Sequence, residues 1–247
     1  MKGKFGVTKQ QAFSNIGVVI PALNESASLK ILLGEITRLY RGITVVVVDD
    51  SGPIEQKKLE ILQKKKFSGA KIHVIFRGKK GGRGSAVLEG MKWLLGDRHI
   101  AYMIEMDADL AHKPEEIRLF LEKKDRGDMI VGSRYLKQSH IIKWPLRRLI
   151  QSKLINFFLR LWLGLNLSDY TNGFRLYSRL AAEALVRAPL KEKGFIALSE
   201  IAYTLKQKGF TVFEVPTTFT DRRFGQSNAD IKELMRSLVG AIRIRFS

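Results

Sequence analysis

The chain has 247 residues, of which 45% are hydrophobic and 27% charged, so a globular protein with a sizeable core is expected and a disordered chain is excluded. It contains no cysteine, which excludes a disulfide framework and thiolate metal sites and is typical of a reducing compartment. The formal net charge of +19 favours a polyanion, an anionic membrane or phosphorylated ligands as partners.

Strand-like runs and helical patterns alternate through the first 135 residues. The runs are apolar and β-branched, as in strands covered on both faces, and they lie at 16–20, 43–48, 72–76, 101–106 and 128–131. Helical periodicity follows Asn24, a candidate helix cap, and returns at 85–95 and 114–124. This βαβ repetition predicts a mostly parallel sheet with ligands at the carboxyl ends of its strands. Amphipathic helices and a strand at 211–215 are expected in the second half.

Polar clusters end three of these runs, with the sequences PALNE (21–25), DDSGP (49–53) and DADLAH (107–112). Parallel strands end at one edge of a sheet, so five carboxylates are expected to crowd together there: Glu25, Asp49, Asp50, Asp107 and Asp109. Capping does not explain the two aspartates of DADLAH, because the next helix begins near Pro114. Oxygen ligands at i and i+2 suit Mg²⁺ or Mn²⁺ shared with substrate phosphates, and a solvated loop is the alternative.

Basic and glycine-rich loops flank the same predicted edge. Backbone N–H groups of RGKKGGRGSAVLEG (77–90) can hold phosphate, and a flexible loop in which Gly84 eases close helix–sheet packing is the equal alternative. Arg134 and the loop DRRFGQSN (221–228) offer arginines for bidentate phosphate binding, although surface charge is their commoner role. DYTNGFRLY (169–177) is either a structural turn held by its Asp and its Arg or a functional loop.

The stretch from Met129 to Ser168 has no acidic residue and mixes basic with aromatic and aliphatic side chains. This mixture predicts a helix in the plane of a membrane surface more than a nucleic-acid groove. The candidate LINFFLRLWLGLNL (154–167) is shorter than the roughly 20 apolar residues that span a bilayer, and it contains Arg160. The pattern at 231–246 predicts a second amphipathic helix, which docks on the domain or on lipid. A transmembrane tail outside this sequence stays open.

These motifs, in this order, resemble family-2 glycosyltransferases and more narrowly dolichol-phosphate (polyprenol-phosphate) mannose synthases. The similarity runs from about Ile16 to Ser227 and rests on VVIPALNE, VVVDDS, RGKKGGRGSA, MDADLAHKPEEI, GSRY, DYTNGFRLY and EVPTTFTDRRFGQS. It implies one glycosyltransferase A-type α/β domain over 1–247, with a mostly parallel sheet flanked by helices and with C-terminal amphipathic interface helices. About 16–135 would form its nucleotide-sugar half, and 136–247 its acceptor and membrane-interface half.

The resemblance also implies the reaction. It implies inverting, metal-dependent transfer of mannose from GDP-mannose to a polyprenyl (dolichyl) phosphate, with Mg²⁺ or Mn²⁺, by a peripheral enzyme on the cytoplasmic face of a membrane. A membrane-anchoring subunit stays open. A phosphate monoester is already anionic near neutral pH, its second pKa being about 6, so no general base is required.

The resemblance assigns roles to particular residues. It implies nucleotide-sugar contacts from Pro21, Leu23, Glu25, Val48, Asp50, Asp107, Ala108, Asp109, Arg134 and Arg222. Catalytic roles are implied for Asp109, Arg134 and Arg222, metal binding for Asp107 and Asp109, and acceptor-phosphate binding for Arg148 and Ser152.

Three positions depart from the family pattern. Leu23 stands where an aromatic residue is usual, Ala111 where Gln or Ser often gives a third metal contact, and Asn228 where lysine is common. We therefore expect Asp107 and Asp109 to be left unpaired by protein groups and to be paired by a metal and a sugar diphosphate. The alternatives are transfer of glucose or another sugar to polyprenyl phosphate, a nucleic-acid-binding protein suggested by the charge, and a silent scaffold subunit. Nucleic acid is not expected as a partner, because the basic residues lie among membrane-favouring aromatics.

Overall fold

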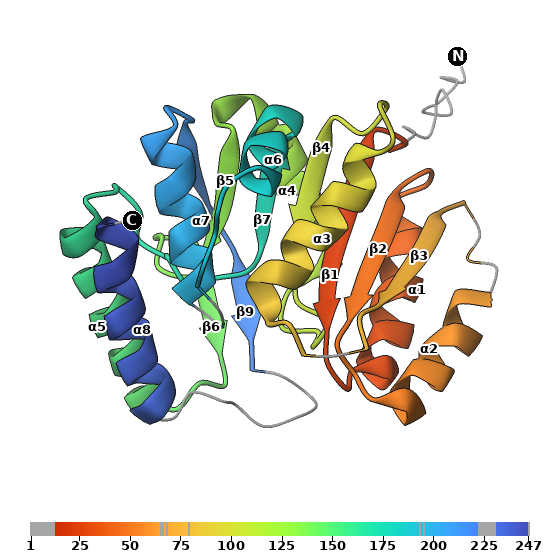
Figure 1. Ribbon diagram of the computed structural model, residues 1–247, viewed down its shortest axis with the longest axis horizontal. Helices are drawn as coiled ribbons and strands as arrows, with labels where there is room; N and C mark the ends of the chain where they lie inside the picture. Colours follow the sequence, from red (N-terminus) through yellow and green to blue (C-terminus); the bar gives the residue numbers. More distant parts are fainter. Residues whose placement is uncertain are drawn as a thin grey trace, which may run out of the picture.

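A central sheet of seven strands, in the order β3-β2-β1-β4-β7-β5-β8, organises the molecule (Figure 1). The computed structural model describes residues 13–64, 67, 69–78, 80–192, 194, 196–221 and 231–246, with only the backbone for 231–237. The strands are β1 Ile16–Ala22, β2 Thr44–Asp49, β3 Lys71–Phe76, β4 Tyr102–Glu105, β5 Met129–Ser133, β7 Arg175–Ser178 and β8 Val212–Pro216. Within this sheet β7 alone is antiparallel to its neighbours.

The six runs expected from the sequence all form strands, since their β-branched residues suit a sheet that is buried on both faces. Three short strands were not predicted. β7 is inserted between β4 and β5, and β6 (His140–Ile142) pairs in parallel with β9 (Thr218–Thr220) in a separate small sheet. Strands of three or four residues carry too little periodicity to be recognised from sequence.

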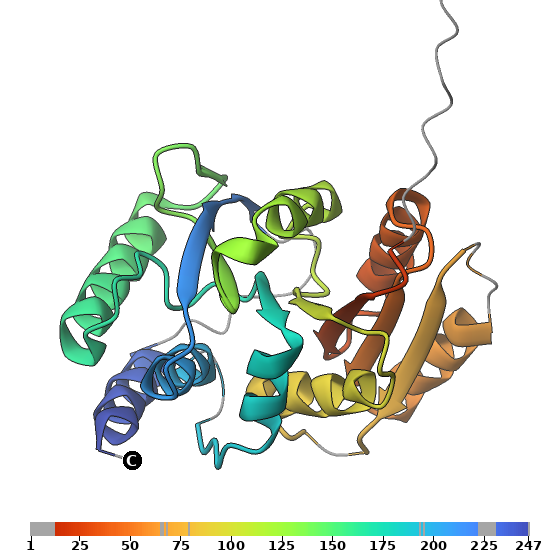
Figure 2. The ribbon, with the colours of Figure 1, turned by 90° about the horizontal axis from the view of Figure 1, so that it is seen from above.

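Helices cover both faces of the sheet because successive strand residues point to opposite sides (Figure 2). Val45 and Val47 pack with one layer, formed by α1 Ser26–Leu39, α2 Pro53–Lys64 and α4 Ile117–Glu122. Val46 and Val48 pack with the other, which contains α3 Arg83–Leu95, α6 Arg179–Val186 and α7 Ile196–Gln207. Two short 3-10 turns flank α4, at Pro114–Glu116 and Lys124–Arg126.

Two further helices, α5 (Leu146–Leu163) and α8 (Ile231–Arg245), lie side by side at one end of the molecule (Figure 1). The Trp162 indole N–H donates to the carbonyl of Ala241 at 2.8 Å and joins the two. α5 ends at Gly164, whose φ of +67° suits glycine in a left-handed cap. Among the described residues, no helix is both long and apolar enough to cross a bilayer.

Candidate active site

The carboxyl ends of β1, β2, β4 and β5 share one edge of the sheet, as the sequence predicted. Ala22 is in register with Asp49, and Val19 with Glu105, so the polar clusters that follow these strands lie along this edge. In the described part of the chain, however, no three acidic or histidine side chains are grouped closely enough to hold a metal. The expectation of one crowded carboxylate cluster is therefore wrong, because the acids are divided among separate partners.

Asp50 is bound by the glycine-rich loop. Arg77 Nε lies 2.5 Å from Asp50 Oδ1, Arg77 Nη2 lies 2.6 Å from Oδ2, and the Gly81 N–H donates to Oδ2 at 3.0 Å. The loop N–H groups before α3 thus hold a carboxylate of the protein itself. Gly84 does allow close packing, since an added Cβ would lie 2.7 Å from Ala197 Cβ, but its neighbour is the helix α7 and not the sheet that we expected.

Arg83, the first residue of α3, contacts two carboxylates at the end of β4. Its Nη2 lies 2.6 Å and its Nε 3.1 Å from Asp107 Oδ1, and its Nη1 forms an ion pair with the fully buried Glu105. The other Glu105 oxygen accepts the Tyr177 hydroxyl at 2.6 Å. The expectation that protein groups leave Asp107 unpaired is therefore wrong: burying Glu105 without a cation would be costly, and the same guanidinium reaches both acids.

Burial of the Arg83 guanidinium acts to lower its pKa, but Asp107 and Glu105 outweigh burial and hold the pKa above its ordinary value. Arg83 is therefore positively charged at all physiological pH values. The same buried Glu105 adds to burial itself in raising the pKa of Tyr177 well above its ordinary value. Arg83 is consequently a fixed cation beside Glu105 and Asp107 at the end of β4.

Asp109 and His112 shape the turn after β4. Asp109 is buried and its Oδ1 accepts the Ala111 N–H at 3.0 Å, across Leu110, whose φ is +63°. His112 accepts the Asp107 N–H on Nδ1 at 3.4 Å, and its Nε2 lies 2.8 Å from Asn172 Oδ1. Nδ1 also lies 3.9 Å from Asp107 Oδ2. His112, which the sequence analysis did not select, is thus a buried support of the Asp107 backbone.

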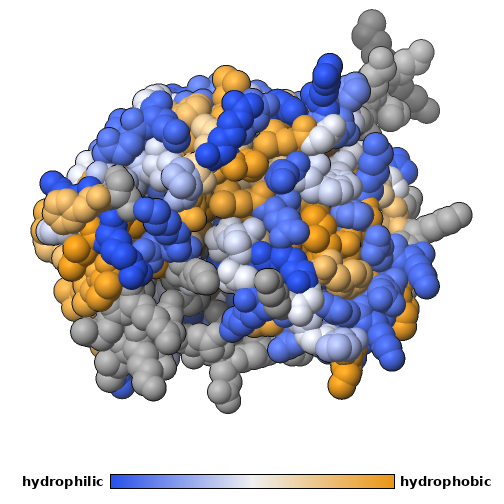
Figure 3. Space-filling view, in the orientation of Figure 1, coloured by the Kyte–Doolittle hydropathy of each residue, from blue (hydrophilic) through white to orange (hydrophobic). Residues whose placement is uncertain are grey.

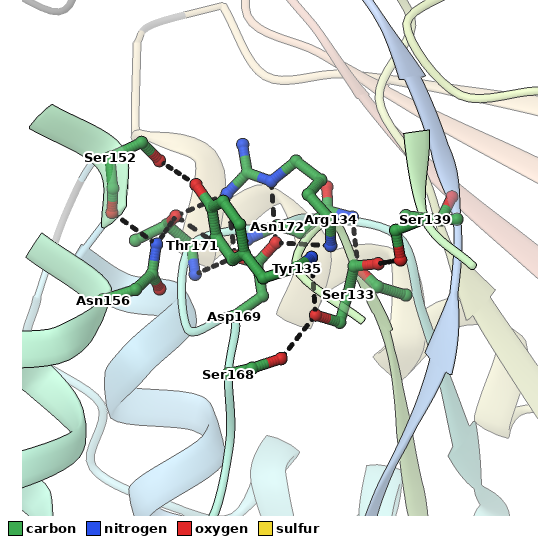
Figure 4. A network of polar contacts seen from close by, with 12 residues as sticks. Ser133, Arg134, Tyr135, Ser139, Ser152, Asn156, Ser168, Asp169, Thr171 and Asn172 are labelled. Carbon is green, nitrogen blue, oxygen red and sulfur yellow. Dashed lines mark hydrogen bonds and ion pairs between the residues drawn. The ribbon is translucent and has the colours of Figure 1, made fainter. Parts of the chain in front are cut away.

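Arg134 is paired with Asp169 in a buried network (Figure 4). Its Nε and Nη2 lie 2.7 and 2.8 Å from the two Asp169 oxygens, and Nη2 also donates to Thr171 Oγ1 at 2.7 Å. Burial acts to raise the pKa of Asp169, yet Arg134 outweighs it and holds that pKa below its usual value. Arg175 is buried too and donates to three backbone carbonyls. The structural-turn interpretation of 169–177 is therefore confirmed.

Trp144 lies between two of the predicted phosphate ligands. Its ring centre is 5.2 Å from the Arg134 guanidinium and 4.2 Å from that of Arg148. Arg148 Nη1 is 2.6 Å from Asp221 Oδ1, and Ser152, one turn along α5, accepts the Tyr135 hydroxyl at 2.6 Å. Trp144 Nε1 is buried and has no hydrogen-bond partner within the described ranges.

The remaining predicted residues differ in accessibility. Pro21, Leu23 and Glu25 are half-buried at the end of β1, whereas the side chains of Val48 and Ala108 are buried in the two cores. Val48 and Ala108 could therefore contact a ligand only through their backbone atoms.

Three other residues singled out from the sequence complete this comparison. The cap interpretation of Asn24 is wrong: α1 has Glu25 at its N-cap, and Asn24, with a φ of +60°, donates its N–H to Ser51 Oγ at 2.7 Å. Arg222 and Asn228 lie outside the described residues.

Comparison with known proteins identifies the family of this chain. The sequence model described as Glycosyl transferase family 2 matches residues 17–186. The chain belongs to this family. A polyprenol monophosphomannose synthase of Mycolicibacterium smegmatis is 35% identical over 222 residues, which are 88% of this chain and 83% of that protein. An undecaprenyl-phosphate mannosyltransferase of Micrococcus luteus is 32% identical over 209 residues, which are 85% of each.

A solved structure agrees on the fold. Glucosyl-3-phosphoglycerate synthase of Mycobacterium tuberculosis, crystallised with Mn²⁺, uridine diphosphate and glucosyl-3-phosphoglycerate, superposes with a TM-score of 0.64 at 18% identity, over 94% of this chain and 78% of that one. This family-2 glycosyltransferase therefore has the glycosyltransferase A-type fold that the resemblance implied. The resemblance to the family and the assignment as an enzyme are confirmed.

Proposed function

We propose that this glycosyltransferase transfers mannose, with inversion, from GDP-mannose to a polyprenyl phosphate at a membrane surface. The observation that carries the proposal is the pair of arginines on either side of Trp144, one at the end of a sheet strand and one on α5. Arg134 follows β5, at the edge where Asp107 and Asp109 lie, and Arg148 belongs to the amphipathic helix. By their names, both curated relatives transfer mannose and one acts on a polyprenyl phosphate of defined length.

On the donor side, we propose Asp107 and Asp109 as the two protein ligands of a divalent metal, whose other positions phosphate and water would fill. Both are carboxylates, the oxygen ligands that Mg²⁺ and Mn²⁺ prefer, and the Asp107 side chain keeps 28% of its surface exposed. A bound Mg²⁺ or Mn²⁺ supplies charge stabilisation to the leaving nucleoside diphosphate. We propose that Pro21, Leu23, Glu25 and Asp50 contact the nucleotide sugar, and that Arg134 and Arg222 contact phosphate.

On the acceptor side, Arg148, Ser152 and the Trp144 indole N–H offer donors to a phosphate monoester. Such an acceptor is already anionic, so the side chains need only to position it and to offset the repulsion between two polyanions. His112 is buried, and its two ring nitrogens lie against the Asp107 N–H and Asn172 Oδ1. This arrangement agrees with a reaction that proceeds without a general base.

The membrane surface is the proposed location of the reaction. Figure 3 shows apolar side chains on the flank formed by α5 and α8, and the 129–168 stretch, which contains α5, carries no acid. An apolar face rimmed by Lys and Arg is typical of helices that lie in the headgroup region of anionic membranes. We place the enzyme on the cytoplasmic face, and we propose lipid rather than an anchoring subunit as the partner of this flank.

A donor screen tests the proposal. Purified enzyme is incubated with a short polyprenyl phosphate and either GDP-mannose or UDP-glucose, with Mn²⁺, with Mg²⁺ or with a chelator. We expect release of GDP that depends on the acceptor and the metal, and a loss of turnover of at least about a hundredfold in Asp109→Asn. Asp125→Asn, at an exposed carboxylate, is the matched control. Preference for UDP-glucose would favour the glucosyltransferase alternative, and wild-type turnover by Asp109→Asn would contradict the site.

A further inference from the structure

Arg83 places a positive charge at the position where the proposed function requires a metal. The guanidinium binds Asp107 Oδ1 through Nε and Nη2, forms an ion pair with Glu105 through Nη1, and lies 3.4 Å from the Gly173 carbonyl. Asp107 is one of the two proposed metal ligands. The described structure therefore already balances part of the negative charge of this site with a side chain of the protein.

The fold makes room for this side chain. A Cβ added at Gly173 would overlap the terminal nitrogen of Arg83, lie 2.7 Å from its Cζ and lie 3.1 Å from Asp107 Oδ1. Any residue larger than glycine at this position would push the guanidinium away from Asp107. Gly173 belongs to the TNGFR motif, and this contact explains why glycine occupies that position.

A divalent ion and a guanidinium compete for Asp107. Two cations on one carboxylate repel each other strongly where the surroundings are partly buried, as they are for Arg83 and Asp107. A nucleoside diphosphate brings the additional negative charge that offsets this repulsion. An arginine guanidinium keeps its charge in proteins, so the competition cannot be relieved by deprotonation.

We infer that Arg83 is an internal cation that holds Asp107 in the nucleotide-free enzyme, so that a divalent metal binds tightly only together with the diphosphate. The inference rests on the proposed metal-dependent function. Glu105 keeps the guanidinium in place through its own ion pair when the metal takes up Asp107. Arg83 is thus a positioning residue that orders the binding of metal and nucleotide, and it is distinct from the proposed metal ligands.

Direct measurement of Mn²⁺ binding, by electron paramagnetic resonance of the free ion, tests the inference without catalysis. The variant Arg83→Met is combined with Glu105→Gln, so that no buried carboxylate is left unpaired, and Glu105→Gln alone is the matched control. A second variant, Gly173→Ala, displaces the guanidinium but keeps its charge. Circular dichroism and thermal melting establish that each variant is folded.

In the wild type and in Glu105→Gln, we expect weak Mn²⁺ binding that GDP strengthens by about tenfold or more. In the double variant and in Gly173→Ala, Mn²⁺ should bind about tenfold more tightly without GDP, so that the effect of GDP shrinks. Unchanged Mn²⁺ affinity in both variants, with normal binding in the presence of GDP, would overturn the inference and leave Arg83 a structural residue. Failure of the wild type to bind Mn²⁺ even with GDP would overturn the proposed metal dependence instead.

Discussion

At the scale of single residues, the candidate site is built from carboxylate–arginine pairs that join distant parts of the chain. Arg134 and Asp169 are the most buried of those that touch a predicted ligand-binding residue. A buried ion pair adds little net stability, because desolvation offsets the attraction, but removing one partner leaves a buried charge uncompensated. The pair therefore fixes where the Arg134 guanidinium lies.

Asp169→Asn tests this role. We expect the free energy of unfolding to fall by about 3–5 kcal/mol, because the Arg134 charge stays buried without its counter-ion. The measurement is urea denaturation of wild type and variant at neutral pH. Asp125→Asn, at an exposed ion pair with Lys124, should change stability by no more than about 0.5 kcal/mol. Equal stability of all three proteins would contradict a buried ion pair.

The same variant predicts a pH dependence. Since the folded-state pKa of Asp169 lies below the ordinary 3.8, its contribution is fully present above that pH and is lost as the pH falls toward the folded-state pKa. The stability difference between wild type and Asp169→Asn should thus be constant at neutral pH and shrink only in acid. A difference that already shrinks between about pH 7 and pH 5 would contradict the lowered pKa.

At the scale of elements, α5 has one buried face and one exposed face. Asn156, Leu159 and Leu163 are buried against the domain. On the other side an apolar stripe repeats at helical spacing with 50–70% of each side chain exposed: Leu146, Ile150, Leu154, Phe157 and Leu161. A contiguous exposed apolar face of this kind marks an interaction surface, and the basic residues interleaved with it suit an anionic membrane.

Leu154→Glu combined with Phe157→Glu tests the proposal that this exposed stripe contacts lipid. We expect the fraction of protein that floats with anionic vesicles to fall about tenfold, because two exposed apolar side chains no longer enter the bilayer and two negative charges are added. The thermal midpoint should stay the same, since neither side chain is buried. Ile61→Glu, at an equally exposed position of α2, is the matched control. Unchanged flotation would exclude α5 as the membrane contact.

At the scale of the whole molecule, charge and topology support one catalytic unit. β7 and β8 come from the second half of the chain, yet they lie in the same sheet as β1 to β5. This shared sheet supports the proposal of a single domain over 1–247. The excess of 43 basic over 24 acidic residues gives the unit a positive field that attracts anionic surfaces.

Salt dependence separates the membrane from the nucleic-acid alternative. Raising salt from about 0.1 to 1 M shortens the Debye length from about 10 to 3 Å, so binding to anionic vesicles should weaken and leave the residual apolar contribution of α5. Binding to a short DNA duplex has no such contribution and should disappear. Vesicle flotation and gel shift are measured over the same salt series. Duplex binding that persists at salt concentrations where vesicle binding is lost would support a nucleic-acid partner.

The sequence by itself determined the longer strands and the family. β-branched runs such as 43–48 form strands wherever they are covered, and the order of short motifs sufficed to identify a family-2 glycosyltransferase. A packing role for Gly84 was also predictable, because only a residue without a side chain allows another segment to approach its backbone closely.

The tertiary structure alone decided which charges meet. Arg83 is 24 residues from Asp107, and Arg134 is 35 residues from Asp169, so no local pattern records either contact. The antiparallel β7 brings Gly173 and Arg175 to the end of β4, and its four residues carry no readable period. The periodicity of a segment indicates which of its residues are buried and which are exposed. The pairing of Asp107 by a protein cation depends instead on how remote segments pack. We expected both acids of DADLAH to be left unpaired by protein groups, but this packing pairs Asp107 with Arg83.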